Sequence, residues 1–166
     1  MTQTQFHQIQ TGADLDPGHW QERHCALFDY WHGIAPSEGG LLPGRRHFDP
    51  LAIPQLLPYL ILYDVERQPR LRLRFRLVGT MVGQWIGTEL TGYYTDEVSD
   101  ISELMQVLGP AIEQGLGVWR RWPRLLRSAE SFSVMEALLL PLAEDGRQVD
   151  MLVGLYQAGD IDGRPL

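Results

Sequence analysis

Hydrophobic and polar residues alternate most regularly near the middle of the chain. Four arginines alternate with four apolar residues in the run Arg70-Leu71-Arg72-Leu73-Arg74-Phe75-Arg76-Leu77. Successive side chains of a β-strand point to opposite faces of a sheet, so this period of two predicts a half-buried strand. The arginine face would meet solvent and the apolar face would meet the core.

The run just before it, Leu60 to Glu66, predicts the hairpin partner of this strand across a loop of residues 67–69. Opposite charges and a shared apolar face both favour this pairing. In the expected register the acidic residues meet arginines, with Glu66 opposite Arg70 and Asp64 opposite Arg72. The apolar pairs on the other face would be Val65 with Leu71, Tyr63 with Leu73, and Ile61 with Phe75.

The first part of the chain contains one amphipathic helix. Residues 1–15 are polar and show no period, so we expect a loose arm. Asp16 and Pro17 then predict a helix start, with an acceptor side chain at the cap and proline in the first turn. The helix would end near Gly33. Its apolar face is rich in aromatic residues and consists of Trp20, His24, Leu27, Phe28 and Trp31.

Further helices follow the glycine- and proline-rich loop 33–47. Residues 49–57 predict a short helix before the hairpin, and residues 80–86 predict one or two helical turns closed by Gly87. A longer helix begins after Asp100, where an acidic cap precedes a glutamate by three residues. Its apolar stripe is formed by Leu104, Val107, Leu108, Ala111 and Ile112.

Three more strands are expected at residues 118–122, 131–142 and 148–157. The last two flank Asp145-Gly146, a dipeptide that favours a tight hairpin turn. Hairpins at both ends of the chain with helices between them imply an antiparallel sheet that carries its helices on one face. The pattern therefore predicts an α+β fold.

Composition narrows the classes of function. The chain has 166 residues, a formal net charge of −7 and no lysine. A net negative charge argues against general affinity for nucleic acid, which is bound through basic surface. No apolar run approaches the length that spans a bilayer, and the first residues lack the pattern of a signal peptide. We therefore expect a cytoplasmic protein that binds no nucleic acid and does not insert into membranes.

Several short motifs lie along the chain, namely Asp49-Pro50-Leu51, Ile53-Pro54, Leu57-Pro58, Arg76-Leu77-Val78-Gly79-Thr80, Gly87-Thr88-Glu89-Leu90-Thr91-Gly92 and Leu140-Pro141-Leu142. Together with the order of elements, they resemble a family of compact stand-alone bacterial PAS-domain proteins over about residues 28–155. The resemblance implies a PAS-like five-stranded antiparallel sheet in the order 2-1-5-4-3, with helices on one face and an N-terminal amphipathic helix. Members of this family typically serve as sensory or protein-interaction modules.

This resemblance divides the chain into three parts. We expect an arm, helix and loop over residues 1–47, a PAS-like core over residues 48–158, and a tail over residues 159–166. In the implied sheet the strand Arg70 to Val78 lies on an edge, where charged side chains protect against edge-to-edge aggregation. Binding of an anionic partner or ligand by the same arginines is the alternative.

The resemblance also implies a cavity between the sheet and its helices. The aromatic and sulfur-containing residues expected near it are Tyr63, Phe75, Met81, Trp85, Tyr94, Met105, Trp119 and Phe132. Such side chains suit a flat or apolar metabolite. They could equally fill the space as core, because protein interiors are densely packed. The sequence leaves both alternatives open.

No residue pattern predicts catalysis or a metal site. An enzyme would need a nucleophile with its base, paired carboxylates or a metal. Asp96 and Glu97 are adjacent and would point apart in an extended segment. The single cysteine, Cys25, excludes a multi-cysteine metal site, and His24 and His32 lie eight residues apart with no further ligand nearby.

No cofactor is expected either. Haem-binding PAS proteins usually ligate iron from the helix that corresponds to residues 100–114, and this segment contains no histidine. Light-sensing flavin members need a reactive cysteine inside the cavity, whereas Cys25 lies on the leading helix.

Two functions follow from this resemblance. The first is a non-catalytic sensory module that binds a small metabolite and signals to a partner protein in trans. The second is a ligand-free protein-interaction adaptor with a filled core. For either function we expect a homodimer, because the aromatic face of the leading helix must dock on its own sheet or on a second copy. The expected interface residues are Trp20, Leu27, Phe28 and Trp31.

Overall fold

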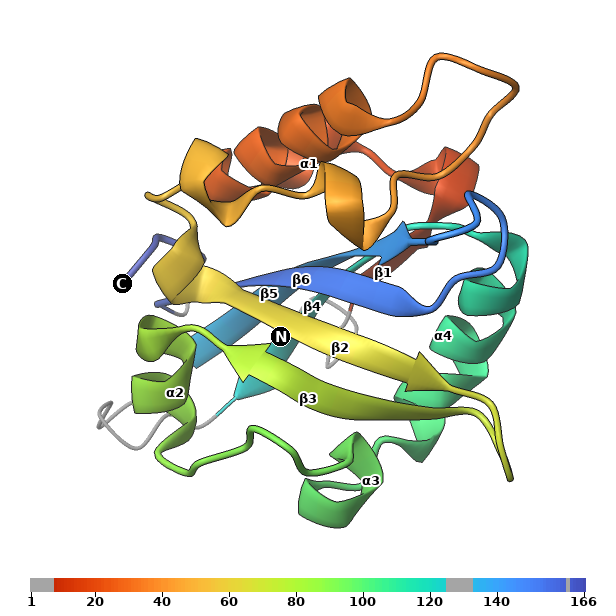
Figure 1. The fold of residues 1–166 in the computed structure, drawn as a ribbon. Helices are drawn as coiled ribbons and strands as arrows, with labels where there is room; N and C mark the ends of the chain where they lie inside the picture. Colours follow the sequence, from red (N-terminus) through yellow and green to blue (C-terminus); the bar gives the residue numbers. More distant parts are fainter. Residues whose placement is uncertain (1–7, 125–132, 161) are drawn as a thin grey trace.

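The computed structural model describes residues 8–124, 133–160 and 162–166, which form a six-stranded antiparallel sheet packed between helices (Figure 1). The strand order is β1-β4-β5-β6-β2-β3. The strands are β1 (Gln8–Thr11), β2 (Leu60–Glu66), β3 (Arg72–Val78), β4 (Val118–Arg124), β5 (Ser133–Leu142) and β6 (Met151–Gly159). Without β1, this order is the expected 2-1-5-4-3, so the predicted α+β, PAS-like sheet is confirmed.

β1 corrects the prediction of a loose arm. Gln8–Thr11 pairs with β4 as a sixth strand, and the N–H of Gly12 donates to the carbonyl of Gly117 beyond it. The strand is four residues long with one apolar side chain, which is too short for its period to stand out. Residues 1–7 of the predicted arm lie outside the described residues.

The hairpin between β2 and β3 exists, but its predicted register is wrong by two residues. Glu66 lies opposite Arg72 and Asp64 lies opposite Arg74. The loop is longer than expected, since it spans residues 67–71 instead of 67–69, and the guanidinium of Arg67 within it donates to the carbonyl of Val149, at 2.6 Å. From Tyr63 to Glu66 this shift of two residues keeps the side chains on their predicted faces, so acidic residues still meet arginines. A bulge between Leu62 and Tyr63 changes the register beyond that point, so Ile61 lies opposite Val78 instead of Phe75, and Leu77 is exposed instead of facing the core.

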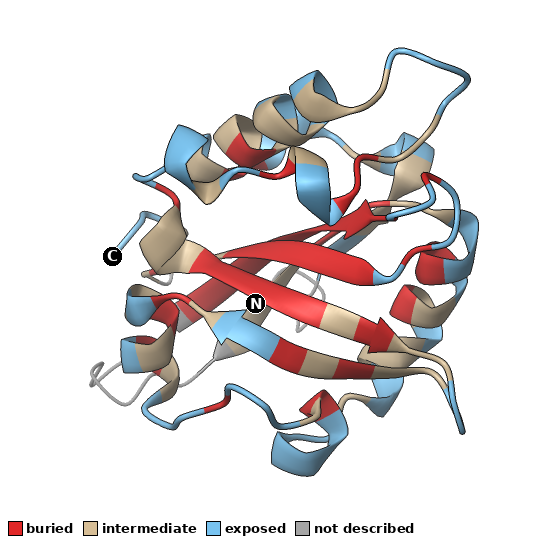
Figure 2. Ribbon diagram, in the orientation of Figure 1, coloured by how far each residue is buried: buried red, intermediate tan, exposed pale blue. Residues whose placement is uncertain are grey.

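Helices cover both faces of the sheet, not one face as predicted (Figure 1). α2 (Thr80–Ile86) and α4 (Ser102–Gln114) share one core with the sheet, and α1 (Glu22–Ile34) shares the other, on the opposite face. The short helix α3 (Thr95–Val98) contacts the edge strand β3. Leu139 of β5 packs on the first side, while Leu138 and Leu140 pack on the second. Because both faces are covered, β5 and β6 are buried along nearly their whole length (Figure 2).

α1 begins later than predicted and docks on its own sheet. The Asp16 carboxylate accepts the N–H of Gly18 in a separate 3₁₀ helix, and α1 starts at Glu22. The side chain of Leu27 is 0% exposed beneath the helix, and Trp20 is buried beside it. The indole N–H of Trp31 donates to the carbonyl of Pro141, at 2.8 Å. This docking leaves Leu27 out of reach of a second copy; homodimerisation through the remaining face stays a prediction.

Most other helix ends lie close to where the sequence placed them. α2 ends at Gly87, which adopts a left-handed φ of 70°, and α4 ends at Gly115 in the same way, with φ 68°. The expected short helix at residues 49–57 is instead two 3₁₀ turns, Pro50–Ala52 and Leu57–Tyr59. Prolines at the start of each turn and the lack of a continuous run of helix formers explain the break.

The final hairpin has a longer connection than a two-residue Asp-Gly turn. β5 ends at Leu142 and β6 starts at Met151, three residues later than predicted. The Asp145 carboxylate accepts the N–H groups of Arg147 and Gln148 and so folds the loop on itself. Within the described ranges, no helix is long and apolar enough to cross a bilayer.

Candidate ligand cavity

A partly enclosed cavity of about 510 Å³ lies between the sheet and the helices α2 to α4. Its volume falls in the range that holds small organic ligands in proteins. The lining residues come from five strands and three helices and the loops between them: Ile61, Tyr63, Leu73, Phe75, Ile86, Thr88, Leu90, Thr95, Val98, Ser99, Asp100, Ile101, Leu104, Leu108, Arg120, Trp122, Leu139 and Tyr156. The lining thus combines an aliphatic wall, four aromatic rings and a small set of polar groups.

Two tyrosines from neighbouring strands meet at the sheet wall of the cavity. The hydroxyl groups of Tyr63 on β2 and Tyr156 on β6 share a hydrogen bond. The ring of Tyr63 also packs at a tilt on Phe75, with 5.3 Å between the ring centres. These contacts fix the aromatic rings, so the cavity wall is largely pre-formed.

β4 contributes a cation and an indole to the same wall. The guanidinium of Arg120 lies over the ring of Trp122, 3.9 Å from its centre, and Trp122 meets Tyr156 edge to face. Alternation along β4 turns Arg120 and Trp122 toward the cavity and Trp119 toward α1. The structure therefore places Trp119 on the opposite face of the sheet from the cavity for which the sequence proposed it.

The remaining predicted lining residues are divided between several places. Tyr63 and Phe75 line the cavity, while Trp85 and Met81 pack in the core around it. Met105 lines a neighbouring groove, and Tyr94 lies at the edge of β3. Phe132 lies outside the described residues. Sequence reasoning missed Arg120, Trp122 and Tyr156, whose common signal is their alternation with core residues along β4 and β6.

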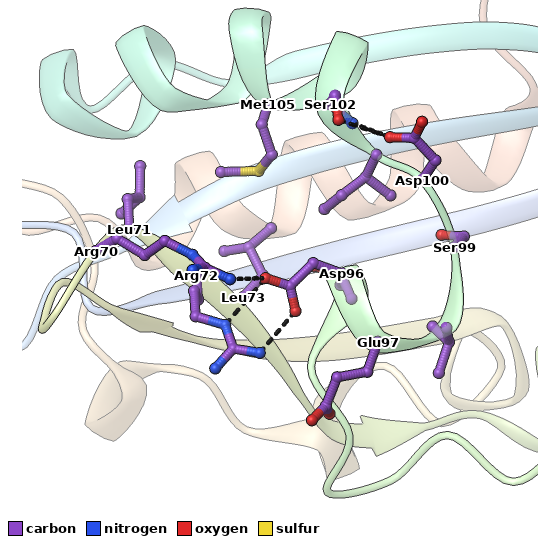
Figure 3. Close-up of a pocket in the computed structure, with 13 residues that line it drawn as sticks. Arg70, Leu71, Arg72, Leu73, Asp96, Glu97, Ser99, Asp100, Ser102 and Met105 are labelled. Carbon is purple, nitrogen blue, oxygen red and sulfur yellow. Dashed lines mark hydrogen bonds and ion pairs between the residues drawn. The ribbon is translucent and has the colours of Figure 1, made fainter.

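A more open groove of about 730 Å³ adjoins the cavity between the β2–β3 hairpin, α3 and the start of α4. Figure 3 shows Arg70 and Arg72 pointing from the hairpin toward Asp96 of α3. Arg72 holds this carboxylate with two hydrogen bonds of 3.0 and 2.7 Å, and Arg70 adds a third of 3.0 Å. We call these three residues the arginine clasp. Hydrogen bonds from Arg72 and then Arg70 lower the pKa of Asp96 to about 2.

Other carboxylates meet the rest of the arginine face. Arg74 and Arg76 both pair with Asp64, at 3.2 and 3.1 Å. The hydroxyl of Tyr94 donates to Glu66, at 2.7 Å. Each arginine of the predicted stripe therefore has a carboxylate partner within the described chain, which supports the edge-strand interpretation over an anion site.

The cavity and the groove share one wall, the segment 95–101 that contains α3. The clasp holds this segment to β3 through solvent-exposed ion pairs, whereas few of its own side chains are buried. Exposed ion pairs contribute little to global stability but can fix a local segment. The clasp therefore positions the outer wall of the cavity.

Asp96→Asn is expected to loosen this wall without unfolding the protein. The substitution keeps the shape of the side chain but removes the charge that Arg70 and Arg72 share. Amide hydrogen exchange in residues 95–101 should become faster, while exchange in β5 and β6 should stay the same. Glu103→Gln removes a nearby exposed carboxylate and is the matched control. Equal exchange in both variants would contradict the role of the clasp.

A second polar cluster is buried on the other face of the sheet, beneath α1. His24 is 0% exposed and its Nδ1 lies 3.9 Å from Oε2 of Glu136, which is 3% exposed. Gln21 donates to the other oxygen of Glu136 and to the carbonyl of Gly163, and Arg121 lies 3.7 Å from Glu136. Burial lowers the pKa of His24 to about 4 and raises the pKa of Glu136. His24 is therefore neutral near pH 7.

Comparison with known families agrees with this architecture. Residues 21–157 match the model of the PAS domain family, and this match covers most of the chain. The chain belongs to the PAS domain family. No curated protein and no solved structure matches it.

Proposed function

We propose that this PAS domain is a non-catalytic sensory module that binds a small molecule in its cavity and signals to a partner protein in trans. The observation that carries the proposal is the cavity of about 510 Å³, which the side chains leave open. A ligand-free adaptor has no need of such a space, because unfilled volume in a core costs stability. The cavity therefore favours a sensor over an adaptor.

The walls of the cavity suggest which part responds to a ligand. The strands of the sheet wall are paired on both sides except β3 at the edge, whereas the segment 95–101 is held by the exposed arginine clasp. Movement costs least where few apolar contacts have to break. Ligand binding would thus change the position of α3 first. A partner that contacts α3 or the groove beside it would detect this movement.

Leu104→Trp should abolish binding of small molecules, because the larger side chain enters the cavity from α4. Native mass spectrometry of gently purified protein, compared with the denatured mass, detects a bound compound directly. A fragment library screened by thermal shift extends the test to weak ligands. We expect bound compounds with the unaltered protein and none with Leu104→Trp.

Leu51→Trp is the matched control, because it makes the same exchange at a residue that is 81% exposed and does not line the cavity. It should bind the same compounds as the unaltered protein. If no compound binds the unaltered protein in either experiment, the adaptor function is favoured instead. Binding that survives Leu104→Trp would place the site elsewhere.

A further inference from the structure

Two charged side chains are found among the described residues that line the cavity, Arg120 and Asp100. They belong to different walls. Asp100 lies on the exposed rim at the start of α4, where its carboxylate accepts the N–H and the hydroxyl of Ser102, at 3.0 and 2.6 Å. Arg120 belongs to β4, within the sheet wall. The cavity is therefore polarised, with a negative rim and a positive sheet wall.

The position of Arg120 suits recognition of a planar anion. Its guanidinium is held over the ring of Trp122, so the side chain has already lost part of its conformational freedom before a ligand binds. A guanidinium carries five N–H donors, so it can serve a ligand in addition to its contacts within the chain. A carboxylate matches this fork with two parallel hydrogen bonds.

The other walls of the cavity indicate the shape and polarity of the rest of the ligand. Trp122, Tyr156 and Phe75 present aromatic rings, and Leu104 and Leu108 of α4 close the space opposite with aliphatic side chains. These surfaces favour a flat, largely apolar body. A phosphate group would carry more charge than the one arginine found among the described lining residues can match.

We propose that the cavity binds an aromatic or similarly flat carboxylic acid, with its carboxylate at Arg120 and its apolar body between Trp122 and α4. This inference rests on the proposed function and specifies the class of ligand at that site. The orientation follows from the charges, because the acid group lies toward Arg120 and away from Asp100.

Matched acid and amide pairs test the inference. We would measure the affinities of 2-naphthoate and 2-naphthamide, and of indole-3-acetate and indole-3-acetamide, by calorimetry. For the unaltered protein we expect each acid to bind about tenfold more tightly than its amide, the effect of one charge-assisted contact. Arg120→Gln should reduce this preference to nearly one while the amides still bind.

Arg147→Gln removes an exposed arginine that does not line the cavity and should keep the full preference for the acids. If the amides bind the Arg120→Gln variant, the cavity of that variant is correctly folded. If Arg120→Gln does not fold, Arg120→Lys serves in its place, and a smaller but persistent preference for the acids is expected because the charge remains.

The outcomes separate the two proposals. Equal affinity for acids and amides in the unaltered protein would overturn the carboxylate inference and leave the sensory function standing. The same conclusion follows if the preference for acids survives Arg120→Gln. If the unaltered protein binds neither acids nor amides, nor any other compound, the sensory function fails and the inference fails with it.

Discussion

Gly79→Ala is expected to lower the free energy of unfolding by about 3 kcal/mol or more, the upper range for overpacking a core. Gly79 joins β3 to α2, and its N–H donates to the carbonyl of Leu60 at 2.7 Å. An added Cβ would lie 2.4 Å from the carbonyl oxygen of Pro58 and 2.5 Å from that of Leu57. Backbone atoms cannot rotate away as a side chain can, so the junction at Gly79 and the 3₁₀ turn Leu57–Tyr59 must move apart.

Gly83→Ala is the matched control for this substitution. It lies on α2 four residues later, and an added Cβ there would meet nothing within 4 Å. Alanine forms helix better than glycine, so this variant should gain up to about 1 kcal/mol. Urea denaturation followed by circular dichroism measures both changes. Equal stabilities for the two variants would contradict the close approach at Gly79.

The same substitution should weaken ligand binding. α2 carries Ile86 into the cavity wall, and its position depends on the junction at Gly79. Any shift of the helix at Gly79 changes the shape of the cavity at Ile86. A folded fraction of Gly79→Ala would therefore bind the compounds of the unaltered protein more weakly, whereas Gly83→Ala would bind them normally.

The second large effect is a loss of stability on mild acidification, caused by His24. Burial lowers the pKa of His24 from 6.5 to about 4 in the folded protein. Below pH 6.5 the unfolded chain binds a proton at His24 that the folded protein does not bind. The free energy of unfolding therefore decreases as the pH is lowered from 6.5 to about 4. Between pH 7 and pH 5 this effect amounts to about 2 kcal/mol.

Glu136 acts in the opposite direction. Its pKa is raised by burial, so the folded protein keeps this proton at a higher pH than the unfolded chain does. Its contribution to stability therefore declines as the pH rises above 4.5. The measured profile of the unaltered protein is the sum of both groups, and a variant is needed to separate them.

His24→Leu isolates the contribution of the histidine. The variant keeps Glu136 and removes the imidazole ring, which is 0% exposed. Urea unfolding at pH 7 and pH 5 should show a clearly smaller loss on acidification than the unaltered protein shows. His19→Gln removes an exposed histidine and controls for the loss of one such residue. An identical acid response in His24→Leu and the unaltered protein would contradict the burial effect.

The sequence predicts those parts of this fold that depend on local pattern. The alternation of residues 70–77, the glycines that close α2 and α4, and the order of elements all led to the observed sheet. The predicted register of the first hairpin was wrong because it depends on the length of the loop, where Arg67 contacts Val149, far away in the sequence, and on a bulge between Leu62 and Tyr63. Local patterns carry no information about such a contact.

The candidate site was harder to predict for a related reason. β4, β5 and β6 are packed on both faces, so apolar character does not tell which residues face the cavity. Trp119 and Trp122 look equivalent in the sequence, yet they belong to opposite faces of the sheet. Choosing between them requires knowing which face α1 covers, and this is a property of the whole fold.

The alternation along β4 also separates the residues that can change the ligand from the residues that hold α1. Arg120 and Trp122 belong to the cavity, whereas Trp119 and Arg121 belong to the face beneath α1, although all four are consecutive in the chain. A lineage could therefore acquire a new ligand by exchanging every second residue of the strand while the alternate positions continue to hold α1. Substitutions at adjacent positions of this strand would then affect two separate properties, ligand binding and the docking of α1.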